Sequence, residues 1–382
     1  MTQVSARLAS LSPSATLAMS QKSSELKAQG VDVINLSVGE PDFNTPEPIK
    51  DAAKKAIDEN YSRYSPVAGY PALRNAIVAK LKNENGLEYT ANQISCANGA
   101  KQSVCNTIMV LVNPGDEVII PAPFWVSYPE MVKLAEGTPV IVAAGIEQDF
   151  KITPAQLETA ITPKTKALIL CSPSNPTGSV YSAEELAGLA EVLKKHPEII
   201  VIADEIYEHI NYIGKHNSIA QVDGMKDRTV IVNGVSKAYA MTGSRIGYAA
   251  GPERLITPIY CAHQYSAMCP CTYAQWGAVA ALRGPQGHIA DMVKELDRRR
   301  LMLLDRLAAM PGVFFVRPKG AFYIMVSIPG LGTPMQAAEF LLDAGLAIVP
   351  WDEEHLRISY ANSYENLSIA MDRMEKALRG RF

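Results

Sequence analysis

Short apolar segments that alternate with helical patterns run through the middle of this 382-residue chain. Each segment is rich in aliphatic and β-branched residues and is bounded by turn residues, which is typical of a buried strand. Between two of them, Ser182 followed by Glu184 and Glu185 predicts a helix with an N-cap and an acidic first turn. Because strand–helix alternation produces mainly parallel sheets covered on both faces, the sequence predicts an α/β fold. The clearest strand segments are residues 117–121, 166–171, 199–203, 229–233 and 247–251.

The pattern changes near residue 287, where one long charged helix is expected up to residue 310. Strand-like segments resume at residues 314–316 and 320–326. We therefore expect a second, smaller α+β domain, since a chain of this length is longer than one ordinary domain and typical of two. The expected division assigns residues 46–286 to a large domain. Residues 1–45 and 287–382 then form an N-terminal arm and the small C-terminal domain.

The charge and the apolar pattern exclude several partners. Lys and Arg number 36 against 39 Asp and Glu, a net charge of −3, so no basic excess exists to hold nucleic acid. No apolar stretch approaches the length that a bilayer needs, and residues 1–20 lack the apolar core of a secretory signal.

The six cysteines lie mostly in apolar runs, which is typical of reduced thiols in a cytoplasmic protein. Only Cys269 and Cys271 are close together, and without nearby ligands we expect no metal site there.

Polar residues follow the ends of several predicted strands, where open α/β sheets bind their ligands. The usual dinucleotide, P-loop, zinc-protease and hydrolase motifs are missing from the sequence, so the chemistry must come from these strand ends. Taken singly, each segment has an ordinary interpretation as a turn, a helix cap or a surface lysine. The order and spacing of all four segments together are harder to explain as a coincidence of ordinary turns, caps and surface residues. The segments are residues 99–102, 172–178, 204–207 and 236–245.

Residues 236–248 read Ser-Lys-Ala-Tyr-Ala-Met-Thr-Gly-Ser-Arg-Ile-Gly-Tyr and are close to a signature of the class I aminotransferases. The resemblance covers nearly the whole chain, from residues 36–43 to residues 356–361, and is greatest to the aspartate aminotransferase branch. Those proteins are pyridoxal-phosphate enzymes of fold type I. The resemblance therefore implies pyridoxal 5'-phosphate as cofactor. It also implies a mainly parallel seven-stranded sheet covered by helices in the large domain.

The resemblance assigns the reacting groups of the cofactor site. Lys237 would hold the aldehyde cofactor as a Schiff base and then move a proton as general acid and base in a ping-pong mechanism. Asp204 would keep the ring nitrogen of the cofactor protonated, because a buried carboxylate favours the cation beside it. Tyr207 and Asn175 would hydrogen-bond the phenolic oxygen of the ring.

The phosphate of the cofactor needs oriented donors and positive charge. A helix that opens at this phosphate loop offers free backbone N–H groups, and an arginine adds a charge-assisted contact. The residues that the resemblance places around the phosphate are Gly99, Ala100, Lys101, Ser236 and Arg245.

Two aromatic residues complete the implied cofactor site. Trp125 matches the family's ring-stacking aromatic, although an ordinary core tryptophan remains the alternative. Tyr64 matches a tyrosine that reaches the phosphate of the neighbouring subunit. If it does so here, the protein is a homodimer with active sites at the interface.

The resemblance also implies amino-acid and 2-oxo-acid substrates. Arg357 would bind the α-carboxylate, which calls for planar bidentate recognition, although it could instead be a structural arginine of the small domain. Aspartate and glutamate are then the expected donors, and 2-oxoglutarate and oxaloacetate the expected acceptors. Gly39, Trp125 and Asn175 would also contact the substrate, and Lys101, Ser14 and Thr16 would recognise the distal carboxylate.

The sequence departs from the family pattern in ways that leave alternatives open. Relatives that also act on prephenate tend to have a basic residue where Ser12 stands. Residues 264–271 are more apolar than in many relatives, and one added apolar contact of about 1–3 kcal/mol could favour aromatic substrates. A cofactor-binding regulator is a further alternative, but the family pattern begins by residue 36 and leaves no room for a DNA-binding module. β-Elimination or decarboxylation also stays open, because Arg357 and Asn175 do not distinguish these reactions.

Overall fold

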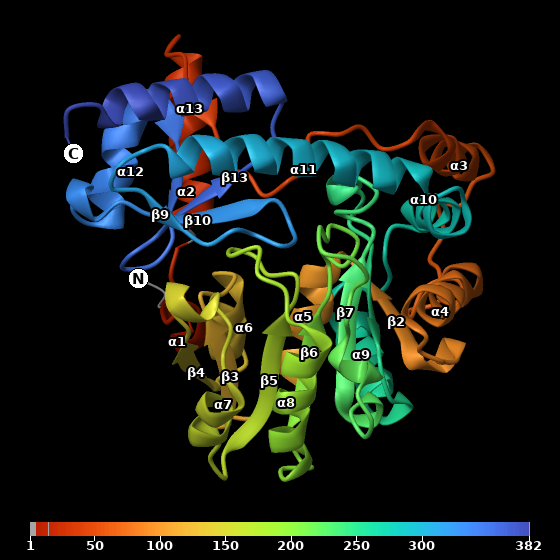
Figure 1. The fold of residues 1–382 in the computed structure, drawn as a ribbon. Coiled ribbons are helices and arrows are strands. Elements are labelled where there is room, and N and C mark those ends of the chain that lie inside the picture. The colour runs from red at the N-terminus through yellow and green to blue at the C-terminus, as the bar shows by residue number, and fades with distance from the viewer. Residues whose placement is uncertain (1–4, 14, 382) are drawn as a thin grey trace.

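The computed structural model describes residues 5–13 and 15–381, and its largest element is a seven-stranded sheet (Figure 1). Only β8 runs antiparallel to its neighbours β7 and β2, so the sheet is mainly parallel. This confirms the predicted α/β class. In spatial order the strands are β2 (Ile94–Ala97), β8 (Gly247–Ala250), β7 (Thr229–Gly234), β6 (Ile200–Asp204), β5 (Thr165–Cys171), β3 (Glu117–Ala122) and β4 (Thr138–Ala143).

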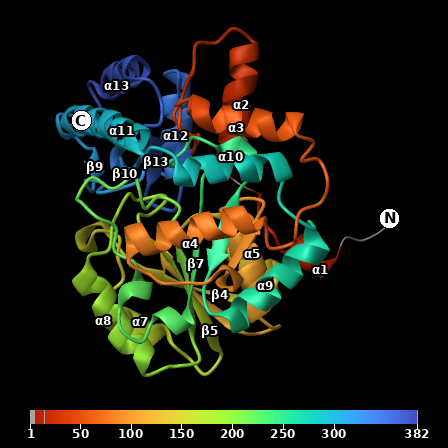
Figure 2. The same cartoon turned by 90° about the vertical axis from the view of Figure 1, so that its right-hand side faces the viewer.

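Helices bury both faces of this sheet because its central strands are apolar throughout. Ile169 faces one apolar cluster, while its neighbours Leu168 and Leu170 face another, as the two-residue period of a strand requires. Figures 1 and 2 show α3, α10 and α4 one above another, and in Figure 1 they lie beside β2. The helices around the sheet are α3 (Glu47–Asp58), α4 (Pro71–Asn85), α5 (Ala100–Leu111), α6 (Ser127–Leu134), α7 (Pro154–Ala160), α8 (Ala183–Lys194), α9 (Glu253–Ser266) and α10 (Thr272–Arg283).

A second, smaller layer lies above the large sheet in Figure 1. Its antiparallel sheet has the order β12 (Val349–Pro350), β13 (Leu356–Ser359), β10 (Tyr323–Ser327) and β9 (Phe314–Phe315). The N-terminal strand β1 (Ile34–Asn35) pairs in parallel with β11 (Leu346–Ala347), so the beginning of the chain joins its C-terminal part. The helices of this part are α2 (Ala15–Ala28), α11 (Gly287–Ala308), α12 (Pro334–Asp343) and α13 (Tyr364–Leu378). The short helix α1 (Ala6–Ala9) instead lies beside α6, next to the large sheet (Figure 1).

Local signals in the sequence form as expected. Ser182 caps α8, its hydroxyl accepting from the backbone N–H of Glu185 at 3.2 Å while the Glu185 carboxylate accepts from the N–H of Ser182 at 2.8 Å. The long charged helix predicted from residue 287 is α11. Within residues 5–13 and 15–381, no helix combines the length and the apolar character that crossing a membrane requires.

Candidate active site

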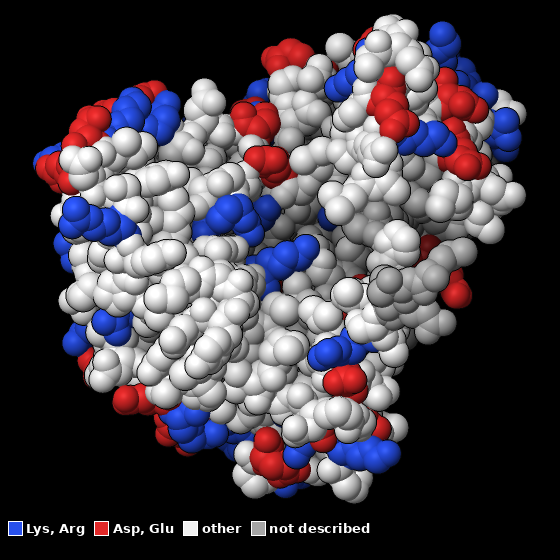
Figure 3. All heavy atoms as spheres, turned by 180° about the vertical axis from the view of Figure 1, so that it is seen from behind, with Lys and Arg blue, Asp and Glu red and all other residues white. Residues whose placement is uncertain are grey.

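A cavity of about 370 Å³ lies at the carboxyl ends of β5, β6 and β7, with the small sheet on its other side. Figure 3, seen from behind, shows basic side chains beside a hollow in the molecular surface. Four basic side chains and one carboxylate line the cavity, which suits an anionic ligand. The lining includes most of the residues expected from the sequence, namely Gly39, Ala100, Lys101, Trp125, Asn175, Asp204, Tyr207, Ser236, Lys237, Arg245 and Arg357.

Lys237 follows β7 and points its amine into this cavity. Its Nζ donates to the carbonyl oxygen of Gly39 at 2.6 Å and lies 5.7 Å from the ring centre of Tyr207. Burial lowers the pKa of Lys237 to about 8, because a charged amine loses its hydration there. The amine is therefore neutral, and able to attack an aldehyde, much nearer to neutral pH than an exposed lysine.

Asp204 ends β6 and is almost completely buried. Its Oδ2 accepts a hydrogen bond from the hydroxyl of Tyr128 at 2.7 Å, and its Oδ1 accepts from the backbone N–H of Ile206 at 3.2 Å. Burial raises the pKa of Asp204 to about 6, while these two donors act in the opposite direction. Tyr128 was not anticipated from the sequence. The available signal was its place three residues after Trp125, against which its ring packs edge-on at 5.4 Å.

The loop before α5 is shaped around Arg245. Gly99 has a φ of +86°, and a Cβ at this position would lie 2.2 Å from Nη2 of Arg245. Arg245 itself donates to the carbonyls of Thr242 at 2.9 Å and Asn98 at 3.2 Å. The first backbone N–H groups of α5 have no carbonyl of their own helix to bind. This cradle of free N–H groups and a guanidinium fits a phosphate dianion.

Lys101 lies in the first turn of α5, with its Nζ 5.0 Å from the ring centre of Trp125. Burial, together with the nearby charge of Arg245, lowers the pKa of Lys101. Lys101 is exposed in the single chain and lines the cavity, so its ammonium can meet an anion that enters there. Its expected contact with a distal carboxylate remains a prediction.

Arg357, on β13, is the largest of the fully buried side chains, with 2% of its surface exposed. Its Nη1 donates to Oδ1 of Asn175 at 3.0 Å, and its Nη2 donates to the carbonyl of Ser37 at 2.6 Å. The guanidinium carbon also lies 4.5 Å from the ring centre of Tyr323 and 4.3 Å from that of Trp351. Sequence reasoning missed Ser37, Tyr323 and Trp351, because they come from segments that meet only in the folded chain.

The remaining expected residues lie elsewhere. Tyr64 is 81% exposed and is not among the residues that line the cavity. Ser14 lies outside the described residues, and Thr16 is described only as part of the backbone of α2. The backbone N–H of Ser12 donates to Oε2 of Glu130 at 2.8 Å, which attaches the N-terminal segment to α6. Among the described residues of this segment, Leu17 lines the cavity.

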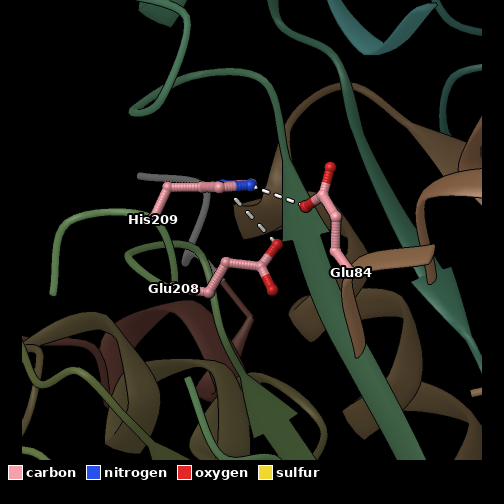
Figure 4. Close-up of side chains that lie close together, drawn as sticks. All are labelled: Glu84, Glu208 and His209. Carbon is pink, nitrogen blue, oxygen red and sulfur yellow. Dashed lines mark hydrogen bonds and ion pairs between the residues drawn. The ribbon is translucent and has the colours of Figure 1, made fainter. Parts of the chain in front are cut away.

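In a second cluster, Glu84 near the end of α4 lies close to Glu208 and His209 (Figure 4). The Nε2 of His209 lies 2.8 Å from Oε2 of Glu84, and the carboxylate of Glu208 is buried beside them. The ammonium of Lys80 hydrogen-bonds Glu208 and lies 2.8 Å from Oδ1 of Asn85 and 3.6 Å from Oε2 of Glu84. Burial opposes ionisation of Glu208, but the charge and hydrogen bond of Lys80, together with the nearby His209 and His216, outweigh it and hold the pKa of Glu208 well below its usual range. The positive charge that pairs with Glu208 and Glu84 is therefore that of Lys80, a side chain of the protein itself.

Comparison with known proteins identifies relatives over nearly the full length of the chain. The family described as aminotransferase class I and II matches residues 31–374. An aspartate aminotransferase of Geobacillus stearothermophilus is 46% identical, with 98% of each chain covered. A probable aspartate/prephenate aminotransferase of Rickettsia bellii is also 46% identical, with 99% of each chain covered. Among solved structures, an aspartate aminotransferase from Thermus thermophilus with maleate has a TM-score of 0.96 and 42% identity, and the match covers 99% of this chain and 100% of the other.

Proposed function

Because this chain belongs to the class I and II aminotransferases, we propose that its pocket transfers the α-amino group of L-aspartate or L-glutamate to 2-oxoglutarate or oxaloacetate. The enzyme is a pyridoxal-phosphate-dependent aminotransferase of the aspartate type. The observation that best supports the proposed substrates is the buried guanidinium of Arg357. It lines the same cavity as the amine of Lys237, and its hydrogen bonds within residues 5–13 and 15–381 go to two neutral oxygens rather than to a carboxylate.

The described residues fit the cofactor. Gly99 leaves no room for a side chain beside Arg245, and this cradle together with Ser236 would hold the phosphate. Asp204 would accept a hydrogen bond from the protonated ring nitrogen, and Lys237 would bind the aldehyde carbon. When bound, pyridoxal phosphate supplies an aldehyde and a ring that draws electrons from the substrate.

Lys237 would act as the proton carrier of the reaction. Its pKa of about 8 lies close to the pH at which a general base and acid are both effective. The carbonyl of Gly39 accepts a hydrogen bond from Nζ and so fixes the direction in which the amine points. The amine would remove a proton from the substrate α-carbon and deliver it to the carbon that was the aldehyde carbon of the cofactor.

The substrate would be oriented by its two carboxylates. Arg357 would bind the α-carboxylate, since Asn175 and Ser37 already hold its planar group in one orientation. Lys101 would bind the distal carboxylate of the substrate. Ser14 and Thr16, whose side chains lie outside the described part of the structure, are the proposed further contacts of that carboxylate. The hydroxyl of Tyr207 would face the cofactor while it remains 2.8 Å from the hydroxyl of Tyr323.

We also propose that the enzyme is a cytoplasmic homodimer. Tyr64 is 81% exposed in the single chain, which leaves it free to reach the phosphate site of a second subunit. The cofactor-binding domain would span residues 46–286, and residues 1–45 with 287–382 would form the arm and small domain. Sedimentation of the purified enzyme tests the dimer, and a Tyr64→Phe variant with weakened cofactor binding would support the shared site.

Activity on prephenate is the second candidate, because several relatives, including one from Cereibacter sphaeroides, are named aspartate/prephenate aminotransferases. The absence of a basic side chain at Ser12 argues against it in this chain. The test is a comparison of kcat/KM for 2-oxoglutarate and prephenate with L-aspartate as donor. We expect the value for 2-oxoglutarate to be higher by at least tenfold. A higher value with prephenate, or with an aromatic donor in place of aspartate, would overturn the proposed preference.

A further inference from the structure

Trp351 connects the two sides of the pocket although it is not among the residues that line it. It follows β12, and its ring centre lies 4.3 Å from the guanidinium carbon of Arg357 on the neighbouring strand β13. Its indole Nε1 donates to the carbonyl of Phe124 at 3.0 Å. Since Phe124 directly precedes Trp125, one side chain joins the strand of Arg357 to the large-sheet loop that carries Trp125.

The turn after Trp351 holds the indole in place. The backbone N–H of Trp351 donates to the carbonyl of His355 at 2.9 Å. Inside the turn, Oδ1 of Asp352 accepts from the backbone N–H groups of Glu354 at 2.9 Å and His355 at 2.7 Å. The ring of His355 is buried and packs edge-on against Phe150 at 5.3 Å. The indole is therefore oriented by protein contacts alone, before any ligand binds.

The indole ring of Trp351 lies where it can stabilise the buried positive charge of Arg357. The guanidinium is buried, and its acceptors within the described chain are two neutral oxygens, on Asn175 and Ser37. The negative face of an aromatic ring stabilises a buried cation without using any of its N–H donors. Trp351, and Tyr323 at 4.5 Å, can therefore keep the guanidinium charged and leave its donors for a carboxylate.

We propose that Trp351 is a positioning residue that sets the affinity of the pocket for carboxylate substrates. It does so by stabilising the guanidinium of Arg357 and by fixing the small sheet against the loop of Trp125. The inference rests on the proposed role of Arg357 in substrate binding. It adds a residue that acts through that arginine without touching the substrate.

The test measures the affinity of the cofactor-loaded enzyme for maleate, a dicarboxylate that has no amino group to transfer, by titration calorimetry. Trp351→Ala removes both the ring and its hydrogen bond, whereas Trp351→Phe keeps a ring. Arg357→Ala shows whether maleate reports on the arginine at all. Trp276→Phe is the matched control, because Trp276 packs edge-on against Tyr61 and does not line the cavity.

We expect Trp351→Ala to weaken maleate binding by about tenfold to thirtyfold, the range of a desolvated cation–π contact. Trp351→Phe should recover part of this loss, and Trp276→Phe should stay within about twofold of the unchanged enzyme. KM for L-aspartate should rise in Trp351→Ala while kcat stays the same, as loss of uniform binding requires.

The outcomes separate this inference from the proposed function. If Arg357→Ala loses maleate binding and Trp351→Ala does not, the role of Trp351 is refuted and that of Arg357 stands. Equal losses in Trp351→Ala and Trp276→Phe would also refute it, since they would show a general loss of packing. If Arg357→Ala binds maleate normally, the proposed role of Arg357 fails and the inference fails with it.

Discussion

Replacing Tyr128 by phenylalanine should raise the pKa of Asp204. The substitution removes the 2.7 Å hydrogen bond from the tyrosine hydroxyl to Oδ2 of a buried carboxylate, and only the N–H of Ile206 remains as a donor. A hydrogen bond to a charged group contributes about 1.5–3 kcal/mol, and one pKa unit corresponds to about 1.4 kcal/mol. The loss should therefore move the pKa of Asp204 upward by about one to two units from its value of about 6.

The pKa of Asp204 can be measured in the apoenzyme by ¹³C NMR of labelled aspartate carboxyl groups, with Asp204→Asn identifying the signal. Tyr181→Phe is the matched control, because the hydroxyl of Tyr181 is also buried but accepts from the backbone N–H of Ile152. Only Tyr128→Phe should shift the midpoint, to about pH 7–8. An unchanged or lower pKa in Tyr128→Phe would show that the tyrosine does not help to keep Asp204 ionised.

Three further perturbations follow from the geometry. Capture of pyridoxal phosphate by the apoenzyme should accelerate as the pH rises through about 8, where Lys237 loses its proton, and stopped-flow absorbance showing a midpoint near 10.5 would contradict this. Gly99→Ala and Gly115→Ala impose the same strain at a φ of +86°, but only the first crowds Arg245, which is proposed to bind the phosphate. Gly99→Ala alone should weaken cofactor affinity, by about tenfold to a hundredfold, and equal losses would refute the cradle. Lys80→Met leaves the Glu208 carboxylate buried without its cation and should reduce the free energy of unfolding by about 3–5 kcal/mol, whereas an unchanged urea midpoint would show that the pair is not needed.

The α/β class could be predicted from local patterns because the central strands are buried on both faces and a helix such as α8 carries a clear cap. The apolar segments that form β3, β5, β6, β7 and β8 and the Ser182 cap are examples, since each depends on residues close together in the sequence. The number of seven strands was implied by the family resemblance and not by local patterns. The groups that the sequence placed at strand ends also meet in one cavity, as the parallel arrangement requires.

Residues that act through long-range contacts were not predictable in this way. The hydrogen bond from Trp351 to Phe124 joins residues 227 positions apart, and that from Tyr128 to Asp204 joins residues 76 positions apart. Neither residue belongs to a motif with a local chemical meaning, because an aromatic side chain at these positions looks like ordinary core. Their partners are set by the tertiary fold, which brings α6 next to β6 and the turn after β12 next to the loop of Phe124.

The most direct test of the proposed function is the absorbance spectrum of the purified, cofactor-loaded enzyme before and after addition of L-aspartate alone. The proposed amino transfer predicts that the absorbance band of the bound cofactor is lost with aspartate and returns when 2-oxoglutarate is added. This result would demonstrate both halves of the reaction and identify the donor. A band that aspartate and glutamate leave unchanged, but that another amino acid removes, would contradict the proposed substrate.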